Sequence, residues 1–200
     1  MKSASRRRLA IAIFAAVAAG IGVAFWLRTP ALELTAGTAL PEPRKIEPFA
    51  LVDQRGQIFD AAALQGRWTL LFTGFTHCPD ICPTTLAMLA ELDERLGPAA
   101  PRFLFLSVDP ERDTPERIAA YLDHFDPDLV GATGSREAVE SFTRGLGLAQ
   151  VRNPGVGNEY TVDHSAALVL IDPRARLAGY FQPPYRIDAL EADLARLPGG

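Results

Sequence analysis

The chemistry of this 200-residue protein centres on its two cysteines, Cys78 and Cys82, which stand four residues apart after an apolar segment. Thiolates are soft ligands that select Cu(I), zinc or iron–sulfur clusters, and a close pair of thiols can also form a reversible disulfide. Two cysteines exclude a disulfide-rich scaffold, and their close spacing argues against a long-range staple. The pair therefore predicts a metal site or a redox-active disulfide.

The spacing of the cysteines permits both kinds of chemistry. In a regular helix the Cβ atoms of residues i and i+4 lie about 5–6 Å apart, whereas a relaxed disulfide needs about 3.5–4.5 Å. Pro79 and Pro83 favour a turn ahead of the next helix, so both cysteines are expected on that turn. Two metal–sulfur bonds of roughly 2.3 Å would allow sulfurs up to about 4.6 Å apart. The helix N-terminus is expected to lower the pKa of the thiols.

Two thiolates do not complete a closed tetrahedral metal site, so a further ligand must come from elsewhere. The chain has three histidines, at positions 77, 124 and 164. His77 adjoins Cys78, and on an extended strand end its side chain would point the opposite way. His124 falls near the end of a predicted helix, where a surface histidine interacts favourably with the helix dipole. His164 precedes an apolar strand and could face the cysteines, and spacing alone does not decide its role.

Strands and helices alternate around the cysteines. Residues 68–75 form a short apolar run typical of a strand buried on both faces, and a helix is expected from Pro83 to Leu96. A second buried strand at 103–108 precedes a capping box and a helix that begins at Pro115. The other predicted elements are a hairpin at 49–59, a short segment at 129–130, a helix at 135–146, a hairpin of 166–171 with 177–181, and a helix at 187–197.

This order of elements predicts a mixed sheet, because helical crossovers give parallel strand pairs and the last hairpin gives an antiparallel pair. We therefore expect an α/β, thioredoxin-like fold, with a mixed central sheet flanked by helices. In open sheets of this kind functional residues lie at the carboxyl ends of strands, and both cysteines fall at such an end.

The N-terminal residues predict one transmembrane helix. Residues 1–8 are basic, and the uncharged run at 9–27 would span roughly 28 Å as a helix, close to the hydrocarbon thickness of a bilayer. The excess of positive charge before the run places the N-terminus in the cytoplasm. A cleaved signal peptide is the alternative, although cleavage after Ala18 would leave too short an apolar core. Either way, we expect a domain in the bacterial periplasm, anchored by a single pass in the inner membrane.

The rest of the chain divides into a linker and one domain. Residues 28–48 hold four prolines and little periodicity, which predicts an extended linker, and residues 49–200 are expected to form the globular domain. Residues 1–28 hold five of the 20 basic residues and none of the 24 acidic ones, so the remainder has a formal net charge of −9. This charge makes nucleic acid an unsuitable partner.

Three segments carry a family resemblance: residues 74–83 (GFTHCPDICP), 107–115 (SVDPERDTP) and 160–165 (YTVDHS). Together, and in this order, they resemble the Sco/SenC family of membrane-anchored copper proteins. The resemblance implies one copper ion, Cu(I) or Cu(II), held by the residues that match Cys78, Cys82 and His164. It also implies delivery of copper to the binuclear site of cytochrome c oxidase subunit II, and a redox disulfide between Cys78 and Cys82 that acts on the cysteines of that partner.

The chemistry of the residues agrees with this resemblance. Two thiolates and one imidazole form an incomplete shell that can hold either oxidation state of copper, and an open site can release its metal. The periplasm is oxidising, so the pair needs a reductant, and a thioredoxin-like periplasmic partner is implied. Asp109 and Asp113 match the acidic loop of the family, although turn formation and helix capping are sufficient to explain them.

The alternative function is enzymatic: a membrane-tethered thiol–disulfide oxidoreductase or a peroxide-reducing relative, with Cys78 as nucleophile and Cys82 as resolving thiol. Thioredoxin-type oxidoreductases use a Cys-x-x-Cys pair and a facing cis-proline, whereas here the spacing is longer and no proline precedes Ala166. We therefore expect a copper chaperone that is not an enzyme, apart from an accessory reductase activity. A copper- or redox-sensing protein is a third class that no sequence feature separates from delivery.

Overall fold

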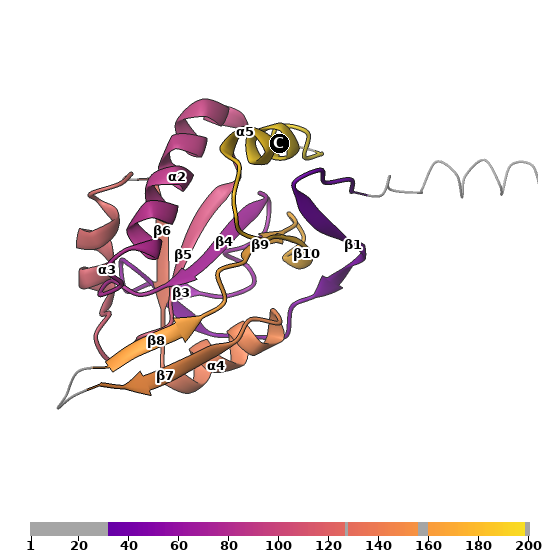
Figure 1. The fold of residues 1–200 in the computed structure, drawn as a ribbon. Helices are drawn as coiled ribbons and strands as arrows, with labels where there is room; N and C mark the ends of the chain where they lie inside the picture. Colours follow the sequence, from indigo (N-terminus) through magenta and orange to yellow (C-terminus); the bar gives the residue numbers. More distant parts are fainter. Residues whose placement is uncertain (1–31, 127, 156–159, 199–200) are drawn as a thin grey trace, which may run out of the picture. The chain divides into compact units, whose positions relative to one another are not determined.

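A mixed sheet lies at the centre of the described structure (Figure 1). The computed structural model describes residues 32–126, 128–155 and 160–198. The predicted membrane anchor, residues 9–27, lies outside these ranges. Within them, no helix combines the length and the apolar character that crossing a bilayer requires.

Eight strands in the described ranges form this sheet, in the spatial order β1-β10-β9-β4-β5-β6-β2-β3. Their bounds are β1 (Gly37–Lys45), β2 (Leu51–Asp53), β3 (Ile58–Phe59), β4 (Thr69–Gly74), β5 (Arg102–Ser107), β6 (Val130–Thr133), β9 (Leu168–Ile171) and β10 (Arg176–Phe181). Strands β4, β5 and β6 pair in parallel, and the pairs on either side of them are antiparallel. The predicted mixed sheet is therefore confirmed, with the hairpin β9–β10 beside the parallel strands.

Helices cover both faces of the sheet. In the described ranges they are α2 (Ile81–Leu96), α3 (Pro115–Leu122), α4 (Arg136–Gly145) and α5 (Ile187–Leu194), with a 3-10 turn η1 (Gly97–Ala99) after α2. Leu70 and Phe72 of β4 pack with α2, α3 and α5, whereas Leu71 faces the opposite way and packs with α4. Figure 1 shows α4 on the other side of the sheet from α2 and α5. This alternation agrees with the prediction that β4 is buried on both faces.

The helices after β5 and β6 begin at side-chain caps. The Thr114 hydroxyl accepts a hydrogen bond from the amide of Arg117 at 3.3 Å, and Pro115 is the first helical residue of α3. The Ser135 hydroxyl accepts a hydrogen bond from the amide of Ala138 at 3.2 Å at the start of α4. Both caps satisfy a backbone donor that has no partner within the helix. The sequence predicted both starting points, the first of them from a capping box.

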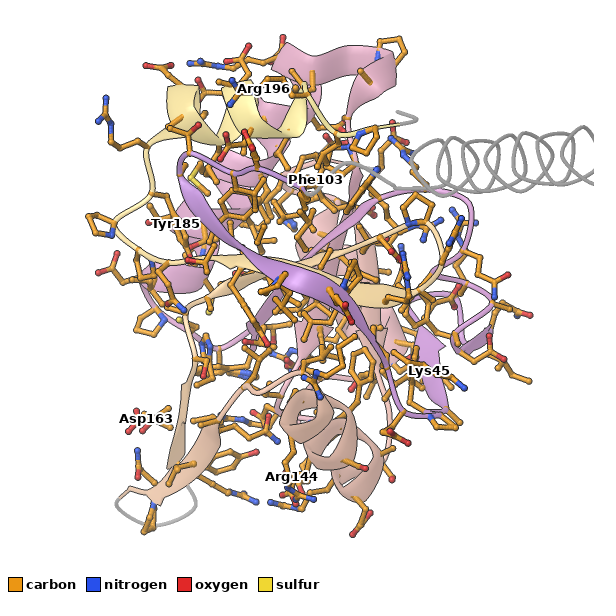
Figure 2. All side chains as sticks on the ribbon, turned by 90° about the vertical axis from the view of Figure 1, so that its right-hand side faces the viewer. Lys45, Phe103, Arg144, Asp163, Tyr185 and Arg196 are labelled. Carbon is orange, nitrogen blue, oxygen red and sulfur yellow. The ribbon has the colours of Figure 1, made fainter. Side chains whose placement is uncertain are left out.

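A separate antiparallel hairpin carries His164. Its strands, β7 (Gln150–Pro154) and β8 (Tyr160–His164), pair with each other and, within the described residues, not with the eight-stranded sheet. The sequence pattern predicted no strand at residues 150–164, because Val162 is the one fully buried residue of β8 and the alternating pattern is correspondingly weak. Asp163, labelled in Figure 2, lies on the exposed side of this hairpin.

The linker prediction for residues 28–48 differs from the structure. Residues 37–45 form β1, which pairs with β10, and the compact unit that holds the sheet begins at Leu32. Pro41 and Pro43 misled the prediction, because proline lacks the N–H that a central strand needs. They fall where the register of β1 shifts, between Ala39 and Arg44, on an edge strand that tolerates proline. Figure 2 views the molecule from the side of β1, with Lys45 at its end.

The segment before β1 is fastened to the last helix by Asp193. The Asp193 carboxylate is buried on α5 and accepts hydrogen bonds from the backbone amides of Thr35 and Ala36 at 2.7–2.9 Å. Arg196 pairs with the same carboxylate at 2.8 Å. Burial raises the pKa of Asp193, but these hydrogen bonds outweigh burial and hold the pKa below its usual 3.8. Residues close to the predicted anchor are therefore bound to the C-terminal end of the domain.

Replacing Asp193 with alanine is expected to lower the free energy of unfolding by about 2–3 kcal/mol, because two backbone amides lose a charged acceptor. Urea denaturation measures this loss. The control is Asp188→Ala, which removes a carboxylate that is 85% exposed on the same helix. It is expected to change the free energy of unfolding by less than about 0.5 kcal/mol. Equal effects of the two variants would contradict this role of Asp193.

The lowered pKa of Asp193 also predicts a pH dependence. The pKa of Asp193 is 3.8 in the unfolded chain and lower in the folded one, so folding favours the carboxylate. The stability that Asp193 contributes is therefore fully present above pH 3.8 and is lost as the pH falls through the folded-state pKa. We expect Asp193→Asn to show a smaller loss of stability than the parent chain over this acidic range. Urea midpoints measured at a series of pH values below about 5 test this difference.

Candidate metal centre

The two cysteines lie at the junction between the carboxyl end of β4 and the start of α2. Cys78 is half-buried in the connecting loop, and its sulfur accepts a hydrogen bond from the amide of Cys82 at 3.4 Å. Cys82 is the second residue of α2, so the prediction that both cysteines precede the helix is wrong for Cys82. The helix includes it because Pro83 still falls in the first turn, where a missing N–H removes no helical hydrogen bond.

Cys82 is completely buried between the sheet and the helix. An added Cβ at Gly74, the last residue of β4, would lie 3.0 Å from the Cys82 sulfur and 2.7 Å from a ring carbon of Phe105. The absence of a side chain at Gly74 therefore makes room for the thiol. Burial, and next the hydrogen bond with Cys78, raise the pKa of Cys82 well above its usual range. The expectation of a lowered pKa is wrong for this thiol, because desolvation outweighs the helix N-terminus.

The end of β8 brings His164 to the buried thiol. Its Nε2 lies 3.7 Å from the Cys82 sulfur, and its Nδ1 lies 3.1 Å from the carbonyl oxygen of Ser165. A carbonyl only accepts hydrogen bonds, so this contact assigns the proton to Nδ1 and leaves the Nε2 lone pair toward the sulfur. Burial lowers the pKa of His164. A neutral imidazole with a free Nε2 is the form that binds a metal.

Two aromatic rings enclose the imidazole. The ring centroids of Phe72 and Phe75 lie 6.1 and 6.0 Å from that of His164, and both rings meet it edge to face. The sequence pattern indicated neither ring as part of the site. Both belong to the apolar run of β4 and its end, so nothing in their pattern separates them from ordinary core residues. They give the partly buried imidazole an apolar environment.

The predicted ligands meet as pairs and not as a closed triad. Cys82 contacts both Cys78 and His164. Two other groups of described residues have all their donor atoms within 4.8 Å of one another, and this triad is not among them. A metal bound by all three residues would hold their donor atoms within about 4.6 Å of one another, so at least one donor must move to close around an ion. Both cysteines are free thiols in the structure. The donor set fits a thiophilic metal in an open arrangement.

The other two histidines do not reach the thiols. The exposed His77 has its Nε2 3.1 Å from the Arg117 guanidinium and its Nδ1 3.9 Å from Asp113. His124 follows α3, with its Nδ1 2.6 Å from the carbonyl oxygen of Ala120. His124 therefore lies at the surface near a helix end, in agreement with its predicted role.

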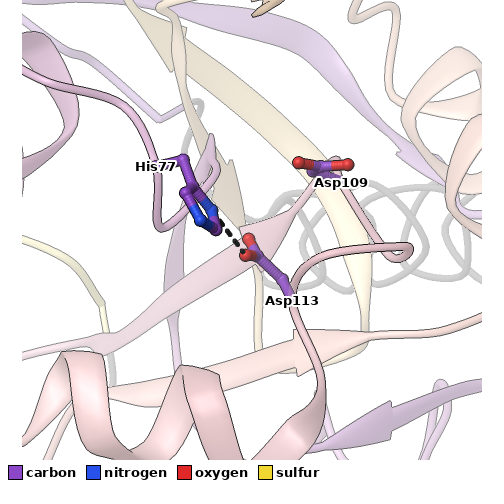
Figure 3. Close-up of side chains that lie close together, drawn as sticks. All are labelled: His77, Asp109 and Asp113. Carbon is purple, nitrogen blue, oxygen red and sulfur yellow. Dashed lines mark ion pairs between the residues drawn. The ribbon is translucent and has the colours of Figure 1, made fainter. Parts of the chain in front are cut away.

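His77, Asp109 and Asp113 form a second cluster of possible ligands, drawn in Figure 3. Both carboxylates are buried and already serve as acceptors. Asp113 accepts hydrogen bonds from the backbone amide and hydroxyl of Thr76 and from the Ser107 hydroxyl, at 2.5–2.9 Å. This carboxylate therefore joins the cysteine loop to the end of β5. The sequence predicted capping for it, but Thr114 caps α3, and Asp113 positions the loop instead.

Comparison with known proteins assigns the family. The model of the family described as SCO1/SenC matches residues 38–198. The chain belongs to the SCO1/SenC family. A protein of Stutzerimonas stutzeri that is named as copper-binding is 38% identical over 162 residues, which cover 79% of each chain. The mitochondrial SCO2 homolog of Bos taurus is 40% identical over 140 residues, 66% of this chain and 52% of that protein.

Solved structures of SCO1/SenC proteins have the same fold. The ScoI protein of Bradyrhizobium japonicum, determined with copper bound, is 36% identical and superposes with a TM-score of 0.70 over 76% of this chain and 98% of that one. BsSco, described as a member of the Sco family of cytochrome c oxidase assembly proteins with a disulfide switch, superposes with a TM-score of 0.62 over 78% and 95%. Its 24% identity supports the fold alone. The predicted mixed α/β, thioredoxin-like fold is confirmed.

Gly74→Ala tests the close packing beneath the thiol in this SCO1/SenC domain. The new methyl group would overlap the Phe105 ring and press on the Cys82 sulfur, so we expect a loss of about 2 kcal/mol in the free energy of unfolding. The control is Gly145→Ala in α4, where an added Cβ meets no atom within 4 Å. This control is expected to be neutral or stabilising by up to about 1 kcal/mol. Unchanged stability of Gly74→Ala in urea would refute the close packing.

Proposed function

We propose that this SCO1/SenC protein is a copper chaperone that binds one copper ion through Cys78, Cys82 and His164. The observation that carries the proposal is the 3.7 Å approach of the His164 Nε2 to the buried Cys82 sulfur, from a hairpin 82 residues further along the chain. The Stutzerimonas relative is named as copper-binding, and the Bradyrhizobium structure was determined with copper bound. Both support copper as the metal.

The donor set suits copper as cargo. Two thiolates favour Cu(I), and the imidazole adds a nitrogen ligand that also suits Cu(II). The histidine enters neutral, because burial lowers its pKa, whereas the buried Cys82 must give up a proton when the metal binds. Two thiolates and one imidazole form an incomplete coordination shell, which supports uptake from one protein and release to another. Cys78, half-buried in the loop, is the donor on the accessible side.

Cytochrome c oxidase subunit II is the proposed recipient. The proposal rests on the resemblance of the three sequence segments to the Sco/SenC family and on the match of residues 38–198 to the model of that family. The dithiol either transfers copper to the cysteines of that subunit or reduces them before transfer. The second route leaves a Cys78–Cys82 disulfide, and a thioredoxin-like periplasmic protein is the proposed reductant that restores the dithiol.

A membrane-tethered thiol–disulfide oxidoreductase is the second candidate function. It is favoured by the place of Cys78 in the loop, where this half-buried sulfur is the more accessible of the two and lies 3.4 Å from the Cys82 amide, as an attacking thiol and its neighbour would. The raised pKa of Cys82 counts against a fast catalytic cycle, because Cys82 must act as a thiolate to resolve a mixed disulfide. We therefore propose reductase activity as an accessory to copper delivery, not as the main function.

The proposed location is the bacterial inner membrane, with the N-terminus in the cytoplasm and the domain in the periplasm. This proposal is supported by the basic residues 1–8 and the uncharged run at 9–27. Since β1 begins at Gly37 and the preceding residues bind Asp193, few residues separate the run from the domain. The domain would then work close to the membrane surface.

Copper titration of the reduced protein tests the ligand set. We expect one copper per chain, loss of tight binding in Cys78→Ser and Cys82→Ser, and weakening of Cu(II) binding by about tenfold or more in His164→Ala. Thiolate–Cu(II) absorption and competition with a chelator measure these changes. His77→Ala and His124→Ala are matched controls, because neither histidine reaches the thiols. Full-affinity Cu(II) binding in His164→Ala would contradict the assignment of His164 as a ligand. Disulfide reduction by a parent chain that binds no copper would favour the oxidoreductase function.

Cell fractionation tests the anchor. The intact protein is expected in the membrane fraction with residues 9–27 retained, because the apolar run is long enough to span the bilayer. Mass spectrometry of the mature N-terminus measures this directly. A mature chain that begins after Ala18 and is released in soluble form would show a cleaved signal peptide instead.

A further inference from the structure

The hairpin β7–β8 is held to the domain by the side chains on one face of β8. Tyr160, Val162 and His164 alternate along the strand on its inner side, whereas Thr161 and Asp163 are exposed. Val162 packs in the core, and His164 approaches Cys82. The hairpin has no ladder with the eight-stranded sheet in the described residues. These inward contacts, together with the hydrogen bond from the Thr73 hydroxyl of β4 to the Ser165 carbonyl at 2.9 Å, therefore fix where the end of β8 lies.

Tyr160 is enclosed by two arginines. The guanidinium carbon of Arg112 lies 3.7 Å from the centroid of its ring, and that of Arg152 lies 3.5 Å from the same centroid. Arg112 comes from the loop after β5, whereas Arg152 lies on β7. Each contact is within the range of a cation–π interaction. The tyrosine ring therefore joins the hairpin to the body of the domain.

Acidic residues of the loop after β5 complete this attachment. The Tyr160 hydroxyl donates a hydrogen bond to the buried Asp109 carboxylate at 2.5 Å, and Arg112 pairs with the same carboxylate. Arg112 also donates to the backbone carbonyl of Tyr160 at 3.2 Å.

Glu111 lies 3.4 Å from Arg152 and also pairs with Arg136 of α4. The two guanidinium charges around the ring are thus balanced, and the hairpin is fixed through its side chains and its backbone.

We propose that this clamp, formed by Tyr160 with Arg112 and Arg152, positions His164 on the thiol pair; the proposal rests on the copper-binding function proposed above. Tyr160 and His164 are four residues apart on one strand, about 13 Å along a stiff extended backbone. The imidazole itself has two edge contacts with aromatic rings, one carbonyl contact and the approach to Cys82. The clamp fixes β8 at its Tyr160 end and so restricts the orientation of the whole strand. This keeps the His164 Nε2 beside the Cys82 sulfur before a metal binds.

The clamp makes Tyr160 a positioning residue, because it touches none of the three proposed ligands in the structure. Arg112 also connects the clamp to the proposed metal site, because its guanidinium carbon lies 5.8 Å from the centroid of the Phe75 ring. Phe75 in turn meets the imidazole edge to face. The clamp therefore supports both the strand that carries His164 and one of the rings that enclose it.

The position of the imidazole can be measured without copper. The chain has three histidines, so selective isotope labelling of the full chain gives three sets of ring signals in an NMR spectrum. The ring currents of Phe72 and Phe75 shift the His164 signals. We expect Tyr160→Ala to move these signals toward the values of an unstructured histidine, whereas Tyr160→Phe, which keeps the ring between the guanidiniums, retains most of the shift.

Two further variants make this measurement decisive. Thr161→Ala, an exposed change on the same strand, is the control and is expected to leave the His164 signals in place. Arg152→Gln removes one side of the clamp at a side chain that is 40% exposed, and serves if Tyr160→Ala does not fold. It is expected to shift the signals in the same direction by a smaller amount. His164 signals that stay within the range of the control in both clamp variants would overturn the proposal.

A copper titration separates positioning from a purely structural role. We expect Tyr160→Ala to weaken Cu(II) binding by about tenfold, in the range seen when the residues that orient a metal ligand are changed. In a His164→Ala background the same change should cause no further weakening, because there is no imidazole to position. Additional weakening in that background would show that the clamp acts through the fold or the thiols, and would refute positioning. A parent chain that binds no copper would refute the proposed function, whereas the metal-free spectra would still decide the role of the clamp.

Discussion

The burial of Cys82 at the first turn of α2 is the constraint on which the site depends. The thiol can occupy this place because Gly74 has no side chain at the end of β4. The thiol is therefore held between a buried strand and the helix that follows it, where burial raises its pKa and the His164 Nε2 lies 3.7 Å from the sulfur. A buried thiol in such a place is a poor free nucleophile and a well-positioned ligand for a soft metal, since metal binding supplies the stabilisation of the thiolate that water does not.

Buried carboxylates organise the loops around that thiol. Asp113 joins the cysteine loop to the end of β5, and Asp109 holds Arg112 and Tyr160 at the base of the clamp. The loop after β5 therefore sets the position of both the cysteine loop and the hairpin that carries His164. Each carboxylate is buried with its hydrogen-bonding partners in place, so removing a partner would leave an uncompensated charge. This explains why an acidic loop lies next to a thiol site without having to bind metal itself.

Several features of the fold were predictable because their signals are local. Buried strands β4 and β5 are short apolar runs, the starts of α3 and α4 carry Thr114 and Ser135 as caps, and the hairpin β9–β10 surrounds a proline-containing turn. The strand β1 was missed because its prolines resemble a linker, and tolerance of proline depends on the edge position of the strand, which only the assembled sheet defines. The hairpin β7–β8 was missed because its strands bury few residues, so its periodicity is weak.

The sequence by itself determined the two thiols and their place between a strand and a helix, and the family resemblance predicted His164 among the three histidines as a ligand. Only the tertiary structure decided that Cys82 is inside the helix with a raised pKa, because desolvation depends on what packs around the sulfur. It also decided that the rings of Phe72 and Phe75 lie against His164, and that Tyr160 joins the strand of His164 to the loop after β5. Contacts between residues far apart in the chain leave no local pattern, and it is these contacts that bring an imidazole from a separate hairpin to a buried thiol.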